Sequence, residues 1–285
     1  MTDRADPAAS AAPPAEAESD GVPVGVVQFA PTAEPDANLA EIARLTRLAV
    51  GRGAQLIVFP EYSSAFVDPF DETLAALAQP LDGPFTRALT VIAAEHDVTL
   101  VAGLLEHGND PARVRNTVVA VDAGGVRATY RKLHLYDAFG QRESDWVEPG
   151  EPGSPELFRA GGLTFGMQTC YDLRFPEVTR TLVDAGAEAV LVPAEWVRGP
   201  LKEHHWRTLL QARAIENTVY VAGADHPPPL GVGHSMIVDP QGVSIAAVGT
   251  GTDVAVAHLD GDAIDRVRRV NPSLALRRFT VTPRG

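Results

Sequence analysis

Short apolar runs and segments of helical periodicity alternate along the first half of the chain. Nearly continuous apolar runs predict strands covered on both faces of a sheet, and they span residues 22–30, 55–59, 99–105, 114–121 and 126–130. Apolar residues at helical spacing predict helices over 36–52 and 84–97, the first with Asp36 as its N-cap. An Ala-Gly-Gly turn at 123–125 predicts a hairpin between the last two strands. This alternation is typical of an α/β protein.

The second half of the chain repeats short patterns of the first half in the same order. The matched pairs are 53–60 with 186–193, 101–103 with 221–223, and 121–126 with 238–243. Any one of these matches is short enough to arise by chance, but their common order indicates two similar α/β halves. Two such sheets packed face to face, with helices outside, make a four-layer αββα sandwich with an internal pseudo-two-fold repeat.

The first 20 residues differ in composition from the rest of the chain. They are almost wholly Ala, Pro, Glu, Asp and Ser, and they lack the apolar segment of a secretory signal. Such a segment buries too little surface to order itself. We therefore expect a disordered tail over residues 1–21 and a single domain over residues 22–285.

The charge balance limits the partners. Acidic residues outnumber basic ones by 37 to 24, for a net charge of −13, which argues against nucleic acid and anionic membranes. No apolar stretch approaches the roughly 20 residues of a membrane span. A single cysteine excludes an internal disulfide framework and permits a reducing compartment. These features predict a cytoplasmic protein.

That cysteine, Cys170, follows an apolar run at 163–167 and precedes a helical pattern that starts near Phe175. A strand followed by a sharp turn fixes a nucleophile and offers free backbone N–H groups to an oxyanion. A lone cysteine is more often a buried structural residue. Here polar neighbours crowd it, among them Gln168, Thr169 and Asp172, which favours a reactive thiol.

Two other predicted strands also end at a reactive side chain. Glu61 emerges after the apolar run at 55–59 and Pro60, and Lys132 follows the strand at 126–130. Charged residues end strands in many proteins, so either one alone could be an ordinary solvated side chain. A carboxylate, an ammonium and a thiol, each at a strand end, together make the parts of a thiolate acyl-transfer site.

These motifs resemble the nitrilase, or carbon–nitrogen hydrolase, superfamily. Its Glu-Lys-Cys triad matches Glu61, Lys132 and Cys170, the last in the motif CYDLRFPE, and its second glutamate matches Glu143. The likeness runs over residues 23–278 in the expected order. It independently implies the αββα sandwich, a reaction without a cofactor or metal, and a homodimer or larger homo-oligomer. The helix that starts near Phe175 and the segment 199–217 are the expected interface.

The resemblance also implies a mechanism. Glu61 would take the thiol proton and later activate water, while Lys132 and the backbone N–H of Tyr171 would stabilise the oxyanion. Glu143 would orient Lys132 or the substrate amide. The motif CYDLRFPE looks like the amidase branch that includes omega-amidase and deaminated-glutathione amidase, which remove a terminal amide from small acids. We therefore expect an amidase that works through a Cys170 thioester.

The candidate substrate-binding residues are Tyr171, Arg174 and Trp196. Arg174 either binds a substrate carboxylate or pairs with Asp172 or Glu177, and the sequence favours neither. Three other functions are kept as alternatives: a nitrilase or related hydrolase, a homologue without catalytic activity, and a cysteine protease with His134 as its base. His204 and His205 are adjacent on a predicted helix, face different directions, and are not a metal site.

Overall fold

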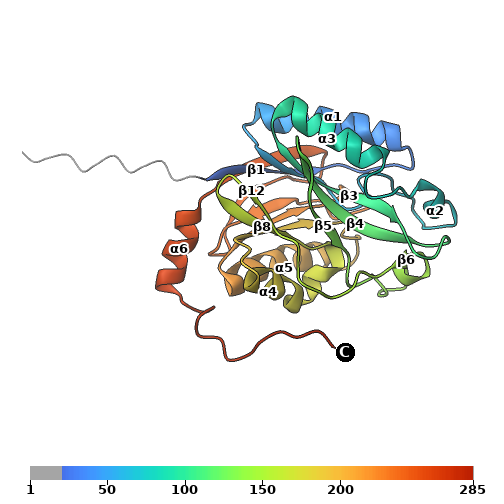
Figure 1. Cartoon of the computed structure of the whole chain (residues 1–285). Coiled ribbons are helices and arrows are strands. Elements are labelled where there is room, and N and C mark those ends of the chain that lie inside the picture. The colour runs from blue at the N-terminus through green and yellow to red at the C-terminus, as the bar shows by residue number, and fades with distance from the viewer. Residues whose placement is uncertain (1–20, 285) are drawn as a thin grey trace, which may run out of the picture.

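The computed structural model describes residues 21–284, so the tail expected at residues 1–21 lies outside it except for Gly21. The strands form two sheets that pack face to face (Figure 1). The first contains β1 (Val22–Gln28), β2 (Leu56–Val58), β3 (Thr99–His107), β4 (Val114–Asp122), β5 (Gly125–Arg131), β6 (Val147–Glu148) and β13 (Asp253–Leu259). The second contains β7 (Phe158–Ala160), β8 (Leu163–Met167), β9 (Ala189–Pro193), β10 (Tyr220–Ala224), β11 (Met236–Val238) and β12 (Ser244–Ala247).

The order of the strands shows the repeat. The first sheet runs β13-β1-β2-β3-β4-β5, with β6 paired to β4, and the second runs β12-β11-β10-β9-β8-β7. In each sheet three parallel strands are followed by two antiparallel ones, so β1 to β5 correspond to β8 to β12. The sequence matches between the two halves fall on corresponding strands. The repeat predicted from the sequence is therefore present in the described chain.

Helices cover the outer face of each sheet and complete the four layers (Figure 1). The covering helices are α1 (Pro35–Gly51), α3 (Pro84–His96), α4 (Pro176–Asp184) and α5 (Lys202–Asn217). Two further helices, α2 (Thr73–Leu77) and α6 (Gly261–Val270), lie at the sides of the sandwich. The helices α1 and α3 share a core with the first sheet, and α4 and α5 share one with the second. A third core lies between the sheets. The αββα sandwich is thus the fold.

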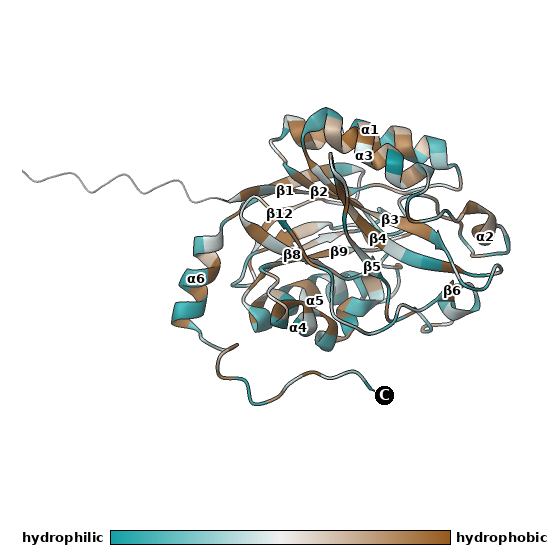
Figure 2. Ribbon diagram, viewed as in Figure 1, coloured by the Kyte–Doolittle hydropathy of each residue, from teal (hydrophilic) through white to brown (hydrophobic). Residues whose placement is uncertain are grey.

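Side-chain alternation along the strands builds these layers. In β1, Val24 and Val26 point into the core between the sheets, whereas Val27 packs with α1 and α3. Both faces of a central strand are therefore buried, which explains the unbroken apolar runs. Figure 2 shows mostly hydrophobic strands and helices of mixed character, as expected where each helix buries one face.

Some local expectations were wrong. The first helix begins at Pro35, so its N-cap is Glu34 and not Asp36, which lies in the first turn. Proline is well suited to the first helical position, because it has no N–H to satisfy there. Gly125 pairs with Asp122 as part of the β4–β5 ladder, which leaves a two-residue turn. The short helix α2 carried no clear periodic signal.

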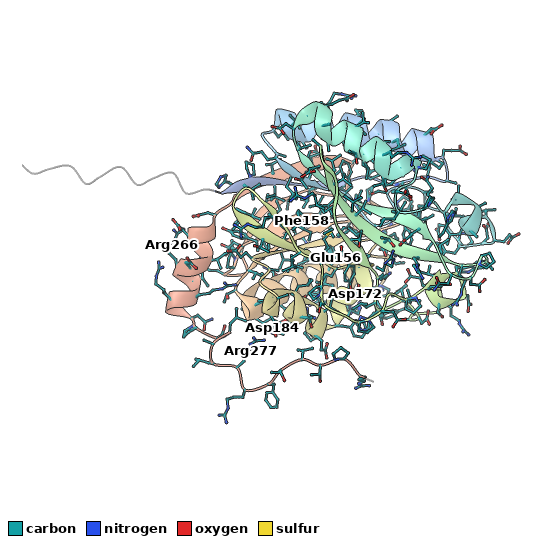
Figure 3. All side chains as sticks on the ribbon, viewed as in Figure 1. Glu156, Phe158, Asp172, Asp184, Arg266 and Arg277 are labelled. Carbon is teal, nitrogen blue, oxygen red and sulfur yellow. The ribbon has the colours of Figure 1, made fainter. Side chains whose placement is uncertain are left out.

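The C-terminal segment passes beside α4 after leaving α6. Arg277 forms an ion pair with Asp184 at the end of α4 (Figure 3). Exposed apolar side chains flank this contact, since Leu276 and Phe279 are 70% and 90% exposed.

Candidate active site

Three strand ends meet at one cavity of about 510 Å³. The β3–β4–β5 meander reverses direction twice, so β5 runs parallel to β2, and Glu61 and Lys132 emerge at the same edge of the first sheet. Cys170 comes from the facing sheet, three residues after β8 ends. Glu143 reaches the cavity from the 3₁₀ helix η1 (Glu143–Asp145). All four side chains predicted as catalytic therefore line one cavity.

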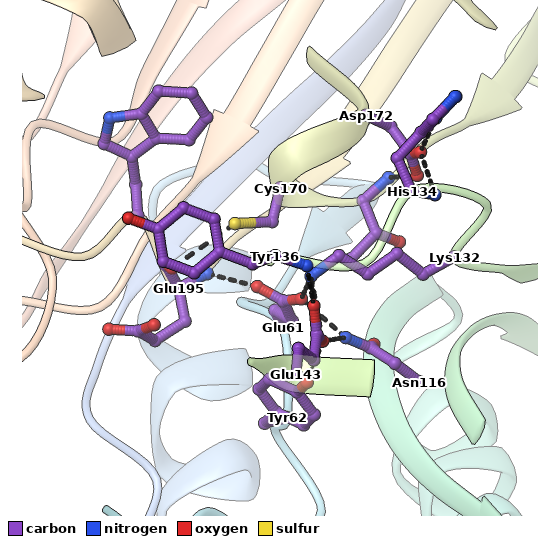
Figure 4. A network of polar contacts seen from close by, with 12 residues as sticks. Glu61, Tyr62, Asn116, Lys132, His134, Tyr136, Glu143, Cys170, Asp172 and Glu195 are labelled. Atoms are coloured by element: carbon purple, nitrogen blue, oxygen red, sulfur yellow. Dashed lines mark hydrogen bonds and ion pairs between the residues drawn. The ribbon is translucent and has the colours of Figure 1, made fainter. Parts of the chain in front are cut away.

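Lys132 is the centre of a buried network (Figure 4). Its Nζ donates to Glu61 Oε1 at 2.9 Å and to the two Glu143 oxygens at 3.0 and 2.8 Å. Asn116 on β4 donates to Glu61 Oε1 at 2.6 Å, and the Tyr62 hydroxyl donates to Glu143. Burial of charges is costly unless hydrogen bonds satisfy them, and here each ionised oxygen and ammonium has partners.

The two carboxylates have different proton affinities. Burial raises the pKa of Glu61 above its ordinary value of 4.5, more than Lys132 lowers it. Burial also raises the pKa of Glu143, but the charge of Lys132 and hydrogen bonds from Lys132, Tyr62 and Tyr136 outweigh it, so that pKa lies below 4.5. Glu143 is thus the ionised partner of Lys132, and Glu61 is the carboxylate better suited to accept a proton.

Cys170 occupies strained backbone beside Glu61. Its φ of 44° lies in the left-handed region that residues other than glycine seldom adopt. The thiol donates to the backbone oxygen of Glu195 at 3.3 Å, and the backbone N–H of Glu195 donates to Glu61 Oε2 at 2.6 Å. Burial, followed by the charge of Glu61, raises the pKa of the thiol well above 9.0. The thiol therefore stays protonated until a base takes its proton.

Asp172 holds the turn that carries Cys170. It forms a capping box with Thr169 at the start of the 3₁₀ helix η2 (Cys170–Arg174) and accepts from the Tyr130 hydroxyl at 2.8 Å. It also contacts both the backbone N–H and Nδ1 of His134, at 2.9 and 2.8 Å. His134 is therefore engaged with Asp172 and makes no hydrogen bond to Cys170 within residues 21–284. The geometry gives the Cys-His protease alternative no support.

Two cations and several aromatic rings form one wall of the cavity. Arg174 lies over the Trp196 ring, 4.8 Å from its centroid, and Lys202 lies 4.0 Å from the centroid of Phe139. Lys202 is only 5% exposed and donates to the Tyr136 hydroxyl at 2.6 Å. Neither cation forms an ion pair with a carboxylate in the described chain. Arg174 in particular pairs with neither Asp172 nor Glu177.

A second group of residues supports the cavity from behind. The Asp225 carboxylate accepts from the backbone N–H of Trp196 at 2.6 Å and that of Gly233 at 3.0 Å. His226 Nε2 donates to the backbone oxygen of Glu61 at 2.8 Å. Burial lowers the pKa of His226 to about 4, so it is a neutral donor that fixes the Glu61 backbone.

Sequence reasoning missed several members of this site. They are Tyr62, Asn116, Glu195, Lys202, Asp225 and His226. Asn116 had a readable signal, because a polar residue inside the apolar run of β4 needs a buried partner. The others show their role only once the loops are folded around the cavity.

A buried thiol beside a carboxylate–lysine network on an αββα sandwich defines a thiol-dependent hydrolase of carbon–nitrogen bonds. The sequence comparison agrees, because residues 23–269 match the carbon-nitrogen hydrolase family. The chain belongs to the carbon–nitrogen hydrolase family, within the nitrilase superfamily, and is a hydrolase of carbon–nitrogen bonds other than peptide bonds.

Similar curated proteins carry an amidase name. The chain is 39% identical to the deaminated glutathione amidase of Escherichia coli over 256 residues, which covers 90% of this chain and 97% of that protein. It is 36% identical to the human deaminated glutathione amidase over 273 residues, covering 90% and 82% of the two chains. These relatives support an amidase function within the superfamily.

Solved structures agree on the fold. Saccharomyces cerevisiae Nit3, described as a member of branch 10 of the nitrilase superfamily, gives a TM-score of 0.79 at 26% identity over 91% of this chain and 97% of that one. A mutant of the amidase from Nesterenkonia sp. gives 0.73 at 28% identity over 90% and 97%. In that mutant the acetamide moiety of fluoroacetamide is covalently added at the active site cysteine.

The described residues contain neither a group of three or more His, Cys, Asp or Glu side chains suited to a metal ion nor a helix long and apolar enough to cross a membrane.

Proposed function

We propose that Cys170, Glu61, Lys132 and Glu143 hydrolyse a terminal amide through a thioester. In the first half-reaction Glu61 takes the proton of the Cys170 thiol, and the thiolate attacks the amide carbon. The support is geometric, since the thiol and the Glu61 carboxylate contact the same residue, Glu195. A base of raised pKa is a stronger proton acceptor than an ordinary carboxylate.

The tetrahedral oxyanion then needs donors. Lys132 is one donor, and its ammonium group is held by Glu143 and Glu61. Burial alone would lower the pKa of Lys132, but the charges of these two carboxylates raise it, so the amine stays protonated. The backbone N–H of Tyr171 lies in the first turn of η2, where no partner within the helix exists for it. As the carbon–nitrogen bond breaks, protonated Glu61 gives its proton to the leaving ammonia, and the acyl group stays on Cys170 as a thioester.

Hydrolysis of the thioester reverses these roles. Glu61, again ionised, takes a proton from a water molecule that attacks the acyl carbon, and the proton returns to the departing Cys170 sulfur. Glu143 stays paired with Lys132 throughout, because its pKa lies below the ordinary range. Asn116 contacts both carboxylates and so fixes their spacing.

The preferred substrate would carry a carboxylate as well as the amide. The observation that carries this proposal is a pair of cations, the half-buried Arg174 and the buried Lys202, which line the cavity without a carboxylate partner in the described chain. A bound carboxylate would relieve their mutual repulsion, which contributes to the lowered pKa of Lys202 after burial itself. Deaminated glutathione and α-ketoglutaramate are amides of this class, and the amidase name of the relatives agrees with it.

Replacement of Arg174 by lysine tests whether Arg174 binds the carboxylate of the substrate. Lysine keeps the charge but cannot form the two-pronged contact of a guanidinium, so KM for glutaramic acid should rise about ten-fold or more. KM for pentanamide, which has the same length and no carboxylate, should change little. Ammonia release measured for both amides gives the two values. A similar loss on both substrates would mean that Arg174 only supports the cavity.

We further propose a homodimer that works in the cytoplasm. Support comes from α5, which covers the second sheet beside α4, and from two exposed apolar side chains, Leu201 just before this helix at 68% and Ile215 within it at 50%. Sedimentation at micromolar concentration should give a dimer or larger species, and Leu201→Glu should shift it toward monomer. A wild-type monomer would contradict the assembly. A reducing compartment would keep Cys170 as a free thiol.

A further inference from the structure

Tyr136 contacts both the catalytic network and the cavity wall that carries Arg174 and Lys202. Its backbone N–H donates to Glu143 Oε2 at 2.6 Å, and its hydroxyl accepts from Lys202 Nζ at 2.6 Å. Figure 4 shows the ring extending away from the Lys132–Glu143 pair, so the hydroxyl is the part of the side chain farthest from that pair. The proposed mechanism needs only the backbone contact and leaves the hydroxyl without a role.

The hydroxyl proton of Tyr136 has no acceptor among residues 21–284. An ammonium group can only donate, so the phenol oxygen accepts the hydrogen bond of Lys202 and keeps its own proton for another partner. Burial is the main reason that the pKa of Tyr136 is raised to about 12, so the hydroxyl stays protonated at neutral pH. The side chain is half-buried and lines the cavity. Its proton is therefore available to a molecule bound there.

The same hydroxyl lies beside both cations of this wall. Because its oxygen is 2.6 Å from Lys202 Nζ, an anion that contacts this ammonium also comes within reach of the hydroxyl proton. Arg174 is close enough for its charge to act against the effect of burial on the pKa of Tyr136. An ionised carboxylate accepts several hydrogen bonds, and a neutral hydroxyl supplies one without adding to the repulsion between the cations. The hydrogen bond from Lys202 also strengthens the hydroxyl as a donor.

We propose that the Tyr136 hydroxyl donates a hydrogen bond to the substrate carboxylate, as a third donor beside Arg174 and Lys202. This inference rests on the proposed amidase function and adds a specificity-determining residue to it. A neutral amide of the same length offers no acceptor at this point and leaves the hydroxyl proton unpaired in the cavity, which costs affinity. Tyr136 therefore favours amides of acids over neutral amides.

Tyr136→Phe tests this role, because it removes the hydroxyl and keeps both the ring and the backbone N–H that binds Glu143. KM for glutaramic acid should rise about ten-fold, the scale of one lost hydrogen bond to a charged group. KM for pentanamide should change by less than about two-fold, because this amide has no carboxylate to lose a contact. The kcat values for both amides should stay near those of the wild type. Ammonia release gives all four constants.

Loss of the hydroxyl also removes the hydrogen-bond acceptor of Lys202, so a second comparison separates the two effects. Tyr136→Phe is combined with Lys202→Met and compared with Lys202→Met alone. A direct contact with the substrate predicts that kcat/KM for glutaramic acid is still about three-fold or more lower in the double variant. Equal values in the two proteins would mean that Tyr136 only orients Lys202, and would overturn the proposal.

Tyr220→Phe is the control, since it also removes one tyrosine hydroxyl, but from a contact with the backbone of Asp260 outside the cavity. Its ratio of kcat/KM for the two amides should equal that of the wild type. An unchanged ratio in Tyr136→Phe would overturn the proposal, and so would a kcat that falls alike on both amides, which would make Tyr136 a support of Glu143. Both results leave the amidase function standing, whereas a wild type that releases ammonia from neither amide would refute that function.

Discussion

Replacement of Cys170 by alanine should lower amide hydrolysis by more than about 10⁴-fold, to the background rate. Loss of a covalent nucleophile removes the whole thioester route, and a substituted nucleophile in other hydrolases costs about 10⁶ in kcat. The fold should survive, because the change removes only one sulfur atom and Cys170 lines the existing cavity. Ammonia release and a thermal melt measure the two effects separately.

Serine at the same position sharpens this test. A hydroxyl has the shape of the thiol but is much harder to ionise, so Cys170→Ser should be nearly as inactive as the alanine variant. Because Cys170 is the only cysteine, intact-mass detection of alkylation reports on this site alone, and a small amide should protect the wild type. Appreciable ammonia release by Cys170→Ala would refute the thioester mechanism.

The strands were predictable because their apolar runs have a single explanation. A run such as Leu56–Val58 is apolar on both faces, and both faces of the strand are covered. The repeat between the two halves also predicted that two similar sheets pack face to face, which no single apolar run indicates. Helix starts were less predictable, since Pro35 and Asp36 both suit the beginning of a helix and only packing decides between them.

The active-site residues also fall into those that the sequence predicts and those that it does not. Glu61, Lys132 and Cys170 each lie two or three residues after a predicted strand or apolar run, so local sequence marks their position at strand ends. Lys202 carried no such signal, because a lysine at the start of a helix is usually solvated. Its burial depends on Tyr136 and Phe139, which come from a loop far away in the sequence. Residues that bind substrate are set by such loops, and a strand pattern does not place them.

The buried network gives each carboxylate a distinct task. Without Lys132, Glu61 and Glu143 would be two buried acids that repel each other, a cost of several kcal/mol. With it, Glu143 stays ionised and Glu61 keeps a raised pKa, partly because of the charge on Glu143. One base that serves both half-reactions needs such a pKa, since it must first accept and then return a proton.

Glu61→Gln should therefore lower kcat by about 10³-fold or more and abolish the acid limb of the pH profile. In the wild type a raised pKa means that Glu61 becomes protonated, and inactive as a base, as the pH falls toward a value that lies above 4.5. Hence kcat/KM should rise with pH through that value. Glutamine retains the shape and the Lys132–Glu143 pair, so the variant should fold.

Glu143→Gln is the matched control for this experiment. It removes the charge that raises the pKa of Glu61, so the acid limb should persist and move to lower pH, while the rate falls because the base is weaker. Profiles of kcat/KM for the three proteins, with rapid-quench mass spectrometry for the acyl-enzyme, distinguish the two roles. If Glu61→Gln accumulates a stable thioester from the amide, acylation proceeds without Glu61, and a single base for both steps is ruled out.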